Sequence, residues 1–276
     1  MTTLFRNILA ALGVLALAGC SGANDDAVTR IAFVGSDSDF SASGLRLSPA
    51  AQHLRAATTQ GLVAINAEGE VVPALAERWI VTDDGMSYIF RLQNTQWSDG
   101  TRVTGGNVQA ALLRNIRELE GTSLGLDLAI VDEIRAMTGR VIEIRLKSPM
   151  PQFLQLLSQP ELGLARNKAT TGPMDGEIDG NTAVLKLFEP EFASDSELDR
   201  WRTQTRQIRI TSLSASDAAK AYYDGEVDAL LNGHLLSLPL ADTGPLARGA
   251  VRLDLVYGLF GLRITNTDGF LEDQLQ

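Results

Sequence analysis

The residue types that perform catalysis or bind metals are sparse in this sequence. Its 276 residues include only two histidines, His53 and His234, and each stands alone. Zinc and nickel sites combine several His or Cys ligands. The sequence also has no phosphate-binding glycine loop after a strand. We therefore expect no catalytic residue, no metal site and no cofactor, and a secreted enzyme ranks as the third hypothesis. If the protein carried nickel, the metal would have to arrive as a chelate. His234 is expected in a loop, where it could border a cleft.

The single cysteine, Cys20, stands at the end of an export-type segment. Arg6 precedes an unbroken apolar run of 11 residues, Ile8 to Ala18, which is too short to cross a bilayer as a helix. Leu17-Ala18-Gly19-Cys20 resembles the lipobox of bacterial lipoproteins, in which the cysteine is acylated. An ordinary signal peptide with a chance cysteine is the alternative, although a leftover thiol is a liability in an oxidising compartment. We predict a lipoprotein signal peptide over 1–19, acylation of Cys20 and a flexible tether over 20–29, so that the chain is exported and anchored to a bacterial membrane.

Charge and composition narrow the class of partner. The formal net charge of −10 argues against binding nucleic acid or anionic lipid through a general positive field. The membrane attachment is therefore expected to depend on acyl chains. A hydrophobic content of 45% is enough to build a core in one or two lobes.

Strands and helices are mixed along the chain, which predicts an α/β or α+β fold without internal repeats. Apolar runs and alternation predict strands and a hairpin, with turns at Asp83-Asp84-Gly85 and Ser98-Asp99-Gly100; the strands are expected at 31–34, 62–65, 71–72, 86–92, 142–146, 184–188, 208–211, 228–231 and 253–262. Helical spacing and capping signals predict helices at 49–60, 104–119, 153–157 and 216–224, with Thr104 as an N-cap. Pro73 is expected to start a short helix, Trp79 to anchor a core, and 170–181 to form a glycine-rich loop.

Several of these segments, in this order, resemble the family 5 solute-binding proteins, which include oligopeptide, dipeptide and nickel binders. The resemblance depends on six pieces spread over residues 60–268: Gln60-Gly61-Leu62-Val63, Pro73 to Trp79, Asp83 to Leu92, Trp97 to Thr104, Arg145 to Leu154, and Asp224 to Asp228. Gly172-Pro173-Met174 and Ile264-Thr265-Asn266-Thr267 also resemble family segments, although Met174 replaces the usual aromatic residue. Gly105-Gly106-Asn107 replaces the acidic helix start of the family.

The resemblance implies a fold and a site. The implied fold is a type II periplasmic-binding-protein base lobe, at 30–48 and 160–276, with a smaller inserted subdomain at about 49–159. A second lobe that closes over the ligand would be largely missing, as if the chain were the N-terminal half of a longer protein. The loop Gly44-Leu45-Arg46-Leu47 falls where relatives present backbone to the ligand, Arg46 could pair with a ligand carboxylate, and Asn266 lies near the implied hinge.

Two functions follow from this resemblance. The first is capture of a small solute, expected to be a peptide, for the permease of an ABC importer, with closure of two lobes around the ligand. The alternative is a truncated lipoprotein that binds a protein partner without capturing solute.

Overall fold

The computed structural model describes residues 28–40, 44–167, 169–189, 194–203, 206–234 and 249–251. The chain divides into two compact units, Met1–Asp242 and Thr243–Gln276, and the elements below belong to the first. The predicted signal peptide, Cys20, Asn266 and the strand expected at 253–262 lie outside the described residues. None of the described helices is long and apolar enough to cross a membrane.

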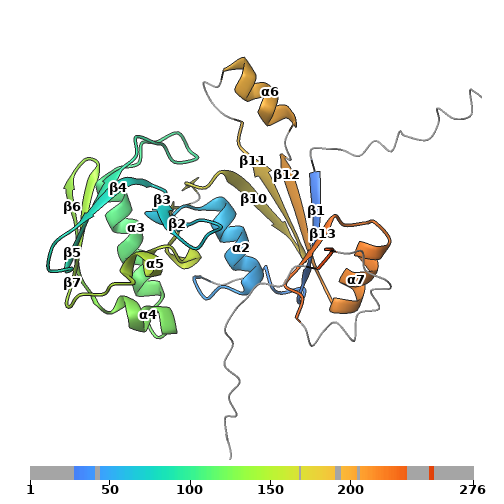
Figure 1. The fold of residues 1–276 in the computed structure, drawn as a ribbon, viewed down its shortest axis with the longest axis horizontal. Helices are drawn as coiled ribbons and strands as arrows, with labels where there is room; N and C mark the ends of the chain where they lie inside the picture. The colour runs from blue at the N-terminus through green and yellow to red at the C-terminus, as the bar shows by residue number, and fades with distance from the viewer. Residues whose placement is uncertain are drawn as a thin grey trace, which may run out of the picture. The chain divides into compact units, whose positions relative to one another are not determined.

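A five-stranded mixed sheet, called the base sheet here, forms one part of the first unit (Figure 1). Its spatial order is β10 (Met174–Asp179), β11 (Thr182–Leu187), β12 (Gln207–Leu213), β1 (Val28–Val34) and β13 (Ala229–Leu231). The last three strands are parallel, whereas β10, β11 and β12 are antiparallel. Helix α7 (Ala215–Tyr223) connects β12 to β13 and contacts β1, and α6 (Asp195–Thr203) lies between β11 and β12 in the chain.

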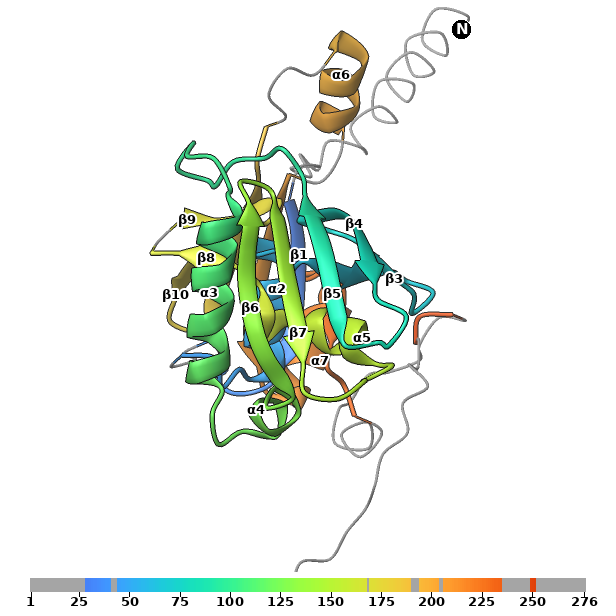
Figure 2. The same cartoon turned by 90° about the vertical axis from the view of Figure 1, so that its left-hand side faces the viewer.

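A four-stranded antiparallel sheet forms the second part, called the inserted part here (Figure 2). Its order is β4 (Ala76–Val81), β5 (Ser87–Leu92), β7 (Val141–Leu146) and β6 (Val131–Thr138). Helix α3 (Gly105–Glu118) packs on β6 and β7. The remaining elements are two small hairpins and short helices, namely β2 (Val63–Ile65) with β3 (Val71–Pro73), β8 (Ala165–Arg166) with β9 (Ala169–Thr170), α4 (Ser123–Leu128), α5 (Phe153–Leu157) and the 3₁₀ turn η2 (Pro160–Leu162).

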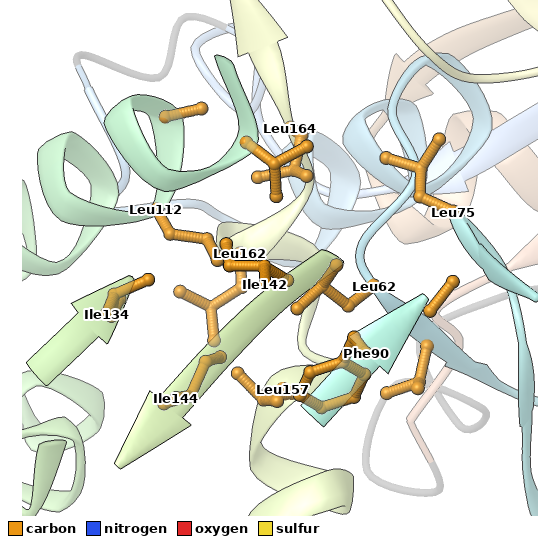
Figure 3. Close-up of a cluster of buried hydrophobic side chains, with 14 of the residues drawn as sticks. Leu62, Leu75, Phe90, Leu112, Ile134, Ile142, Ile144, Leu157, Leu162 and Leu164 are labelled. Carbon is orange, nitrogen blue, oxygen red and sulfur yellow. The ribbon is translucent and has the colours of Figure 1, made fainter. Parts of the chain in front are cut away.

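The inserted part contains the larger apolar core (Figure 3). Phe90, Ile142 and Ile144 project from the sheet, and Leu112 of α3 reaches the same cluster. The alternation of buried and exposed side chains along β7 follows the period of two that the sequence shows. This core therefore holds α3 and the sheet together as one scaffold.

A smaller cluster lies against the base sheet. Helix α2 (Pro49–Thr58) contributes Ala50 and Leu54, which pack with Phe33 of β1 and Ile210 of β12. The sequence prediction began the inserted subdomain at about residue 49 and so placed α2 in it. In the structure α2 packs against the base sheet. At the other boundary, Leu162, Leu164 and Ala169 join the core of the inserted part. We propose that the inserted part runs from Leu62 to Ala169.

Most of the local structure matches its sequence signals. Thr104 begins α3 and its side chain accepts from Asn107 N, as an N-cap does. Gly85 and Gly100 have φ of +68° and +78°, which side chains with a Cβ rarely adopt. The mixed α/β class is confirmed.

Two local predictions are wrong. Pro73 ends β3, where a missing N–H is tolerated at the end of a short strand, and no helix follows it. Residues 174–179, expected from their glycine content to belong to a loop, form strand β10. Pairing with β11 satisfies the backbone hydrogen-bonding groups of this segment. Trp79 packs against the core of the inserted part, as expected, although it is half-buried, whereas Trp97, 2% exposed, is the enclosed indole.

Candidate functional site

The three parallel strands of the base sheet end together. The register pairs Val34 of β1 with Leu213 of β12, and Phe33 with Leu231 of β13. In open α/β sheets ligands bind in the crevice outside the carboxyl ends of such strands. The residues that follow these ends are therefore the first place to look for a binding surface.

The loop after β1 is held in one conformation by its own side chains. Ser36 donates to the Asp39 carboxylate from its backbone N at 2.8 Å and from its Oγ at 2.7 Å. Ser212 of β12 donates to Ser36 O at 2.8 Å, which ties the loop to the neighbouring strand. A Cβ at Gly35 would lie 1.9 Å from Asp39 Oδ2, so this arrangement requires glycine. Asp37 and Ser38, at the tip, are exposed.

Polar residues also follow β12 and β13. Ser214 caps α7 by accepting from Asp217 N and donating to the Asp217 carboxylate at 2.6 Å. Asn232 adopts a left-handed φ of +61° and donates from Nδ2 to Val34 O at 2.8 Å. His234 is exposed two residues further on. Hydroxyl, amide and carboxylate groups thus line the carboxyl edge, which is suited to hydrogen bonding with a polar ligand.

A cavity of about 350 Å³ lies where the described chain resumes at residue 44. Two of the predicted site residues, Gly44 and Leu45, line this cavity, together with residues from α2, α3 and β8 and with Asn167, which follows β8. Leu45 is 5% exposed and belongs to the core of the inserted part, so its side chain is committed to packing. Gly44 has a φ of +69°, and a Cβ there would lie 2.7 Å from Glu118 Oε1.

The other predicted site residues are placed differently. Arg46 is exposed and Leu47 half-buried, and neither lines the cavity. Asn266 lies outside the described residues. The structure thus brings Gly44 and Leu45 together at the cavity. That the predicted residues bind a ligand stays a prediction.

An arginine joins the two parts of the unit beside this cavity. Arg55 of α2 donates from Nε to Pro160 O at 2.9 Å and from a terminal nitrogen to Gly163 O at 2.8 Å. Burial lowers the pKa of the Arg55 guanidinium, while the nearby carboxylates of Glu118 and Glu161 oppose that shift. Two carbonyls and two carboxylates thus surround one cation at the junction, which keeps it charged and fixed in position.

Two further side chains complete this junction. Asn115, 1% exposed, donates from Nδ2 to Glu161 O at 3.2 Å and to Gly163 O at 3.0 Å. Gln52 donates to Glu161 Oε1 at 2.8 Å, and Glu161 Oε2 has no partner among the described residues. These polar residues escaped the sequence analysis, because nothing in the local sequence indicates that α2, α3 and η2 meet.

A second cavity of about 640 Å³ lies on the inserted part. It is lined by Arg102, Arg140, Asn94, Val103, Thr104 and Gly139. None of the predicted site residues lines it. Within the described residues, no group of three or more His, Cys, Asp or Glu side chains is arranged to hold a metal ion.

Comparison with known proteins gives one family. Residues 70–230 match the model of the bacterial extracellular solute-binding proteins, family 5 middle region. The chain is 32% identical over 129 residues to the probable deoxycholate-binding periplasmic protein YgiS of Escherichia coli K12, covering 37% of this chain and 23% of the relative. It is 27% identical over 211 residues to the glutathione-binding protein GsiB of Shigella dysenteriae, covering 74% and 38%.

The fold has solved counterparts of the same kind. A periplasmic oligopeptide-binding protein of Borrelia burgdorferi, OppAIV, superposes with a TM-score of 0.64 at 20% identity, covering 78% of this chain and 50% of that one. These counterparts share the type II periplasmic-binding-protein fold, which confirms the predicted architecture. The chain spans between about a quarter and half the length of the relatives it matches.

Proposed function

We propose, from the premise that this chain belongs to the bacterial extracellular solute-binding proteins of family 5, that it captures small solutes, foremost peptides, for an ABC importer. Its base sheet would supply the fixed half of the binding site. The observation that carries this proposal is twofold: polar groups follow the carboxyl ends of β1, β12 and β13, and the predicted site residues Gly44 and Leu45 line a cavity.

The chemistry of these groups suits an extended peptide. Main-chain N–H and C=O groups of a peptide bind to exposed backbone, while side chains enter tolerant pockets. Gly44 offers backbone without a side chain, and the exposed Asp37 carboxylate could accept a peptide ammonium group. Arg46 remains the candidate for a ligand carboxylate, and Asn266 the candidate near the hinge.

The relatives' names suggest which solutes to try. GsiB is named for glutathione, OppAIV for oligopeptides and YgiS for deoxycholate. Glutathione and oligopeptides are peptides, whereas deoxycholate is a steroid. The polar groups at the carboxyl edge of the base sheet favour the peptides. We therefore place peptides of two to five residues, glutathione included, ahead of apolar solutes.

Titration calorimetry of the full chain tests this function. A mixture of short peptides should release heat, and Gly44→Ala should weaken the strongest binder about tenfold, or 1.4 kcal/mol, because the Cβ strains a left-handed residue and meets Glu118. Gly106→Ala is the matched control, since its Cβ would meet nothing within 4 Å.

The outcomes separate capture from the alternative. If Gly44→Ala and the unmodified protein bind the peptide with equal affinity, the loop at Gly44 does not belong to the binding site. No heat with any peptide, with glutathione or with deoxycholate would contradict solute capture and favour the protein-interaction module.

We also propose that the chain is exported and anchored through an acylated Cys20. The support is the apolar run and lipobox-like sequence before Cys20, together with the extracellular family. Palmitate labelling of the full chain in a bacterial host should occur, and Cys20→Ser should abolish the label and release the protein from the membrane fraction. Label retained in Cys20→Ser would contradict the anchor.

A further inference from the structure

The cavity of about 640 Å³ on the inserted part is lined by two basic residues and by no acidic one. Its wall comes from three segments, namely Asn94 after β5, residues 102–104 before α3, and Gly139 with Arg140 in the turn between β6 and β7. None of these residues belongs to the peptide site proposed above. The cavity is therefore a separate feature of the inserted part, and its lining favours a negatively charged ligand.

The two arginines at this cavity have no carboxylate partner. Arg102 is exposed, and among the described residues its side chain makes no hydrogen bond and no ion pair. Arg140 is half-buried, and its guanidinium donates to Leu92 O at the long distance of 3.4 Å. Both guanidinium groups thus keep several N–H donors free, and their planar geometry matches the oxygen atoms of a phosphate group.

The acidic residues that are nearest to these arginines in the sequence do not neutralise them. Asp99 is paired with Arg166 at 2.9 Å and accepts from Thr101. Glu143 lies on the face of β7 opposite to the buried residues that pack against α3. The positive charge at the cavity is therefore left for a ligand.

Backbone hydrogen bonds fix the three segments of the wall. Gly105 N, at the start of α3, donates to Gly139 O at 2.8 Å, and Leu92 N donates to Arg140 O at 2.8 Å. A Cβ at Gly105 would lie 2.8 Å from Thr138 O, so the start of α3 packs closely on the turn between β6 and β7. Figure 2 shows α3 beside these two strands. A wall held in this way is formed before a ligand arrives, which lowers the entropic cost of binding.

The start of α3 adds to the effect of the arginines. Thr104 lines the cavity and accepts from Asn107 N, so its hydroxyl hydrogen remains free to donate to a ligand. The first turn of this 14-residue helix contains no acidic residue, where the resembling family has an acidic start. The helix dipole therefore favours an anion at this position, and no side chain of the first turn supplies one.

We infer that this cavity binds a small soluble phosphate compound, either inorganic phosphate or a phosphate monoester, through Arg102, Arg140 and the Thr104 hydroxyl. A phosphate dianion matches two guanidinium groups, whereas a carboxylate carries a single charge. The volume of about 640 Å³ leaves room for an organic part beside the phosphate. The inference does not rest on solute capture, because it concerns the inserted part alone.

The overall charge of the chain is compatible with this ligand. A net charge of −10 repels extended anions such as nucleic acid or an anionic membrane, which face the whole molecule. A small ion inside the cavity is close to the two arginines, whereas salt screens charges that are more than about 8 Å away in exposed positions. A soluble phosphate compound is therefore favoured over a lipid surface.

Nuclear magnetic resonance of the isotope-labelled full chain tests the site. Inorganic phosphate is added at about pH 8, where it is mainly a dianion, and sodium chloride keeps the ionic strength constant. We expect saturable shifts of the amide signals of residues 102–106 and 139–141. Glycerol 3-phosphate should shift the same signals, and acetate at equal concentration should bind more weakly.

Two double variants with equal changes of charge test the arginines. Arg102→Gln with Arg140→Gln should weaken phosphate binding by at least about tenfold, because both charged donors are lost. Arg117→Gln with Arg145→Gln removes the same charge near the other ends of α3 and β7, and should leave the affinity unchanged. The single variant Arg102→Gln, at an exposed side chain without a hydrogen bond, should also weaken binding while thermal melts stay the same.

A pair of substitutions at Thr104 separates binding from stability. Aspartate and serine both cap helices at least as well as threonine, so Thr104→Asp and Thr104→Ser should each preserve the melting temperature. Thr104→Asp places a carboxylate on the cavity wall and should abolish phosphate binding. Thr104→Ser keeps the hydroxyl and should retain it.

Three results would overturn the inference: no saturable shift with phosphate, equal affinities of the two double variants, or equal affinities of the two Thr104 variants. Acetate binding as tightly as phosphate would overturn the assignment to a phosphate compound. A failure of peptide capture would change none of these outcomes, so the two proposals are tested separately.

Discussion

The inserted part and the base sheet differ in how completely they bury their apolar side chains. Among the described residues, the core of the inserted part has 24 buried members, whereas the cluster on the base sheet has seven. The edge strands of the base sheet, β10 and β13, have no buried residue. The candidate site lies along the less enclosed part, so the inserted part acts as a scaffold while the base sheet keeps polar groups accessible.

The largest effect is expected from breaking the core of the inserted part. Phe90 is fully buried between the sheet and its helices, and Phe90→Ala should lower the free energy of unfolding by about 4 kcal/mol through lost burial and a cavity. Urea denaturation measures it. Ile80→Ala, at a side chain that is 65% exposed, serves as the control and should cost less than about 0.5 kcal/mol.

The same substitution in the base sheet should cost less. Phe33 is 1% exposed, but its cluster is small and the surrounding residues can collapse into the space, so we expect Phe33→Ala to cost about 2 to 3 kcal/mol. A cost equal to or above that of Phe90→Ala, measured in the same denaturation series, would show that the two cores do not differ in the way their burial indicates.

Removing Arg55 tests the junction between the two parts. Arg55→Ala leaves Pro160 O and Gly163 O without their charged donor and should cost about 2 kcal/mol. It should also separate the unfolding of the two parts, which would appear as a second transition in calorimetry. Arg46→Ala, at an exposed arginine, is the control, and an equal effect of both variants would argue against a structural junction.

The smallest effect concerns a surface turn of the inserted part. Hydrogen bonds from Thr101 and the nearby Arg166 hold the pKa of the Asp99 carboxyl below its ordinary value. A lowered pKa in the folded state contributes stability above the unfolded pKa, and this contribution is lost as the pH falls through the folded value. Asp99→Asn should therefore destabilise the protein slightly at neutral pH and not at acidic pH, as thermal melts across pH 2 to 7 would show. A difference that grows toward acid would contradict this assignment.

The sequence predicted features that depend on a few neighbouring residues. Thr104 as an N-cap, the glycine turns at Gly85 and Gly100, and the alternation in β7 are local, and each is present. Strand β6 was not predicted, because only Ile134 of its eight residues is buried and an edge strand shows no alternation.

The parts of the site that depend on distant pairing could not be read in advance. Arg55 and Asn115 look like ordinary polar positions on two helices, and only the packing of α2 and α3 against η2 gives them common partners. The loop at Gly44 was identified through the family resemblance, since its own composition indicates only a turn. Local sequence signals thus predict the helices, strands and turns of the scaffold, whereas the contacts at the site depend on how distant segments pack together.

Hydrogen exchange of the full chain, with and without the peptide that binds most tightly, tests the central claim most directly. If the carboxyl edge of the base sheet and loop 35–48 form the fixed half of the site, peptide should slow amide exchange in segments covering residues 36–48 and 232–234, and leave β6 and β7 unchanged. Protection confined to the inserted part, or absent from residues 36–48 at saturating peptide, would contradict the account.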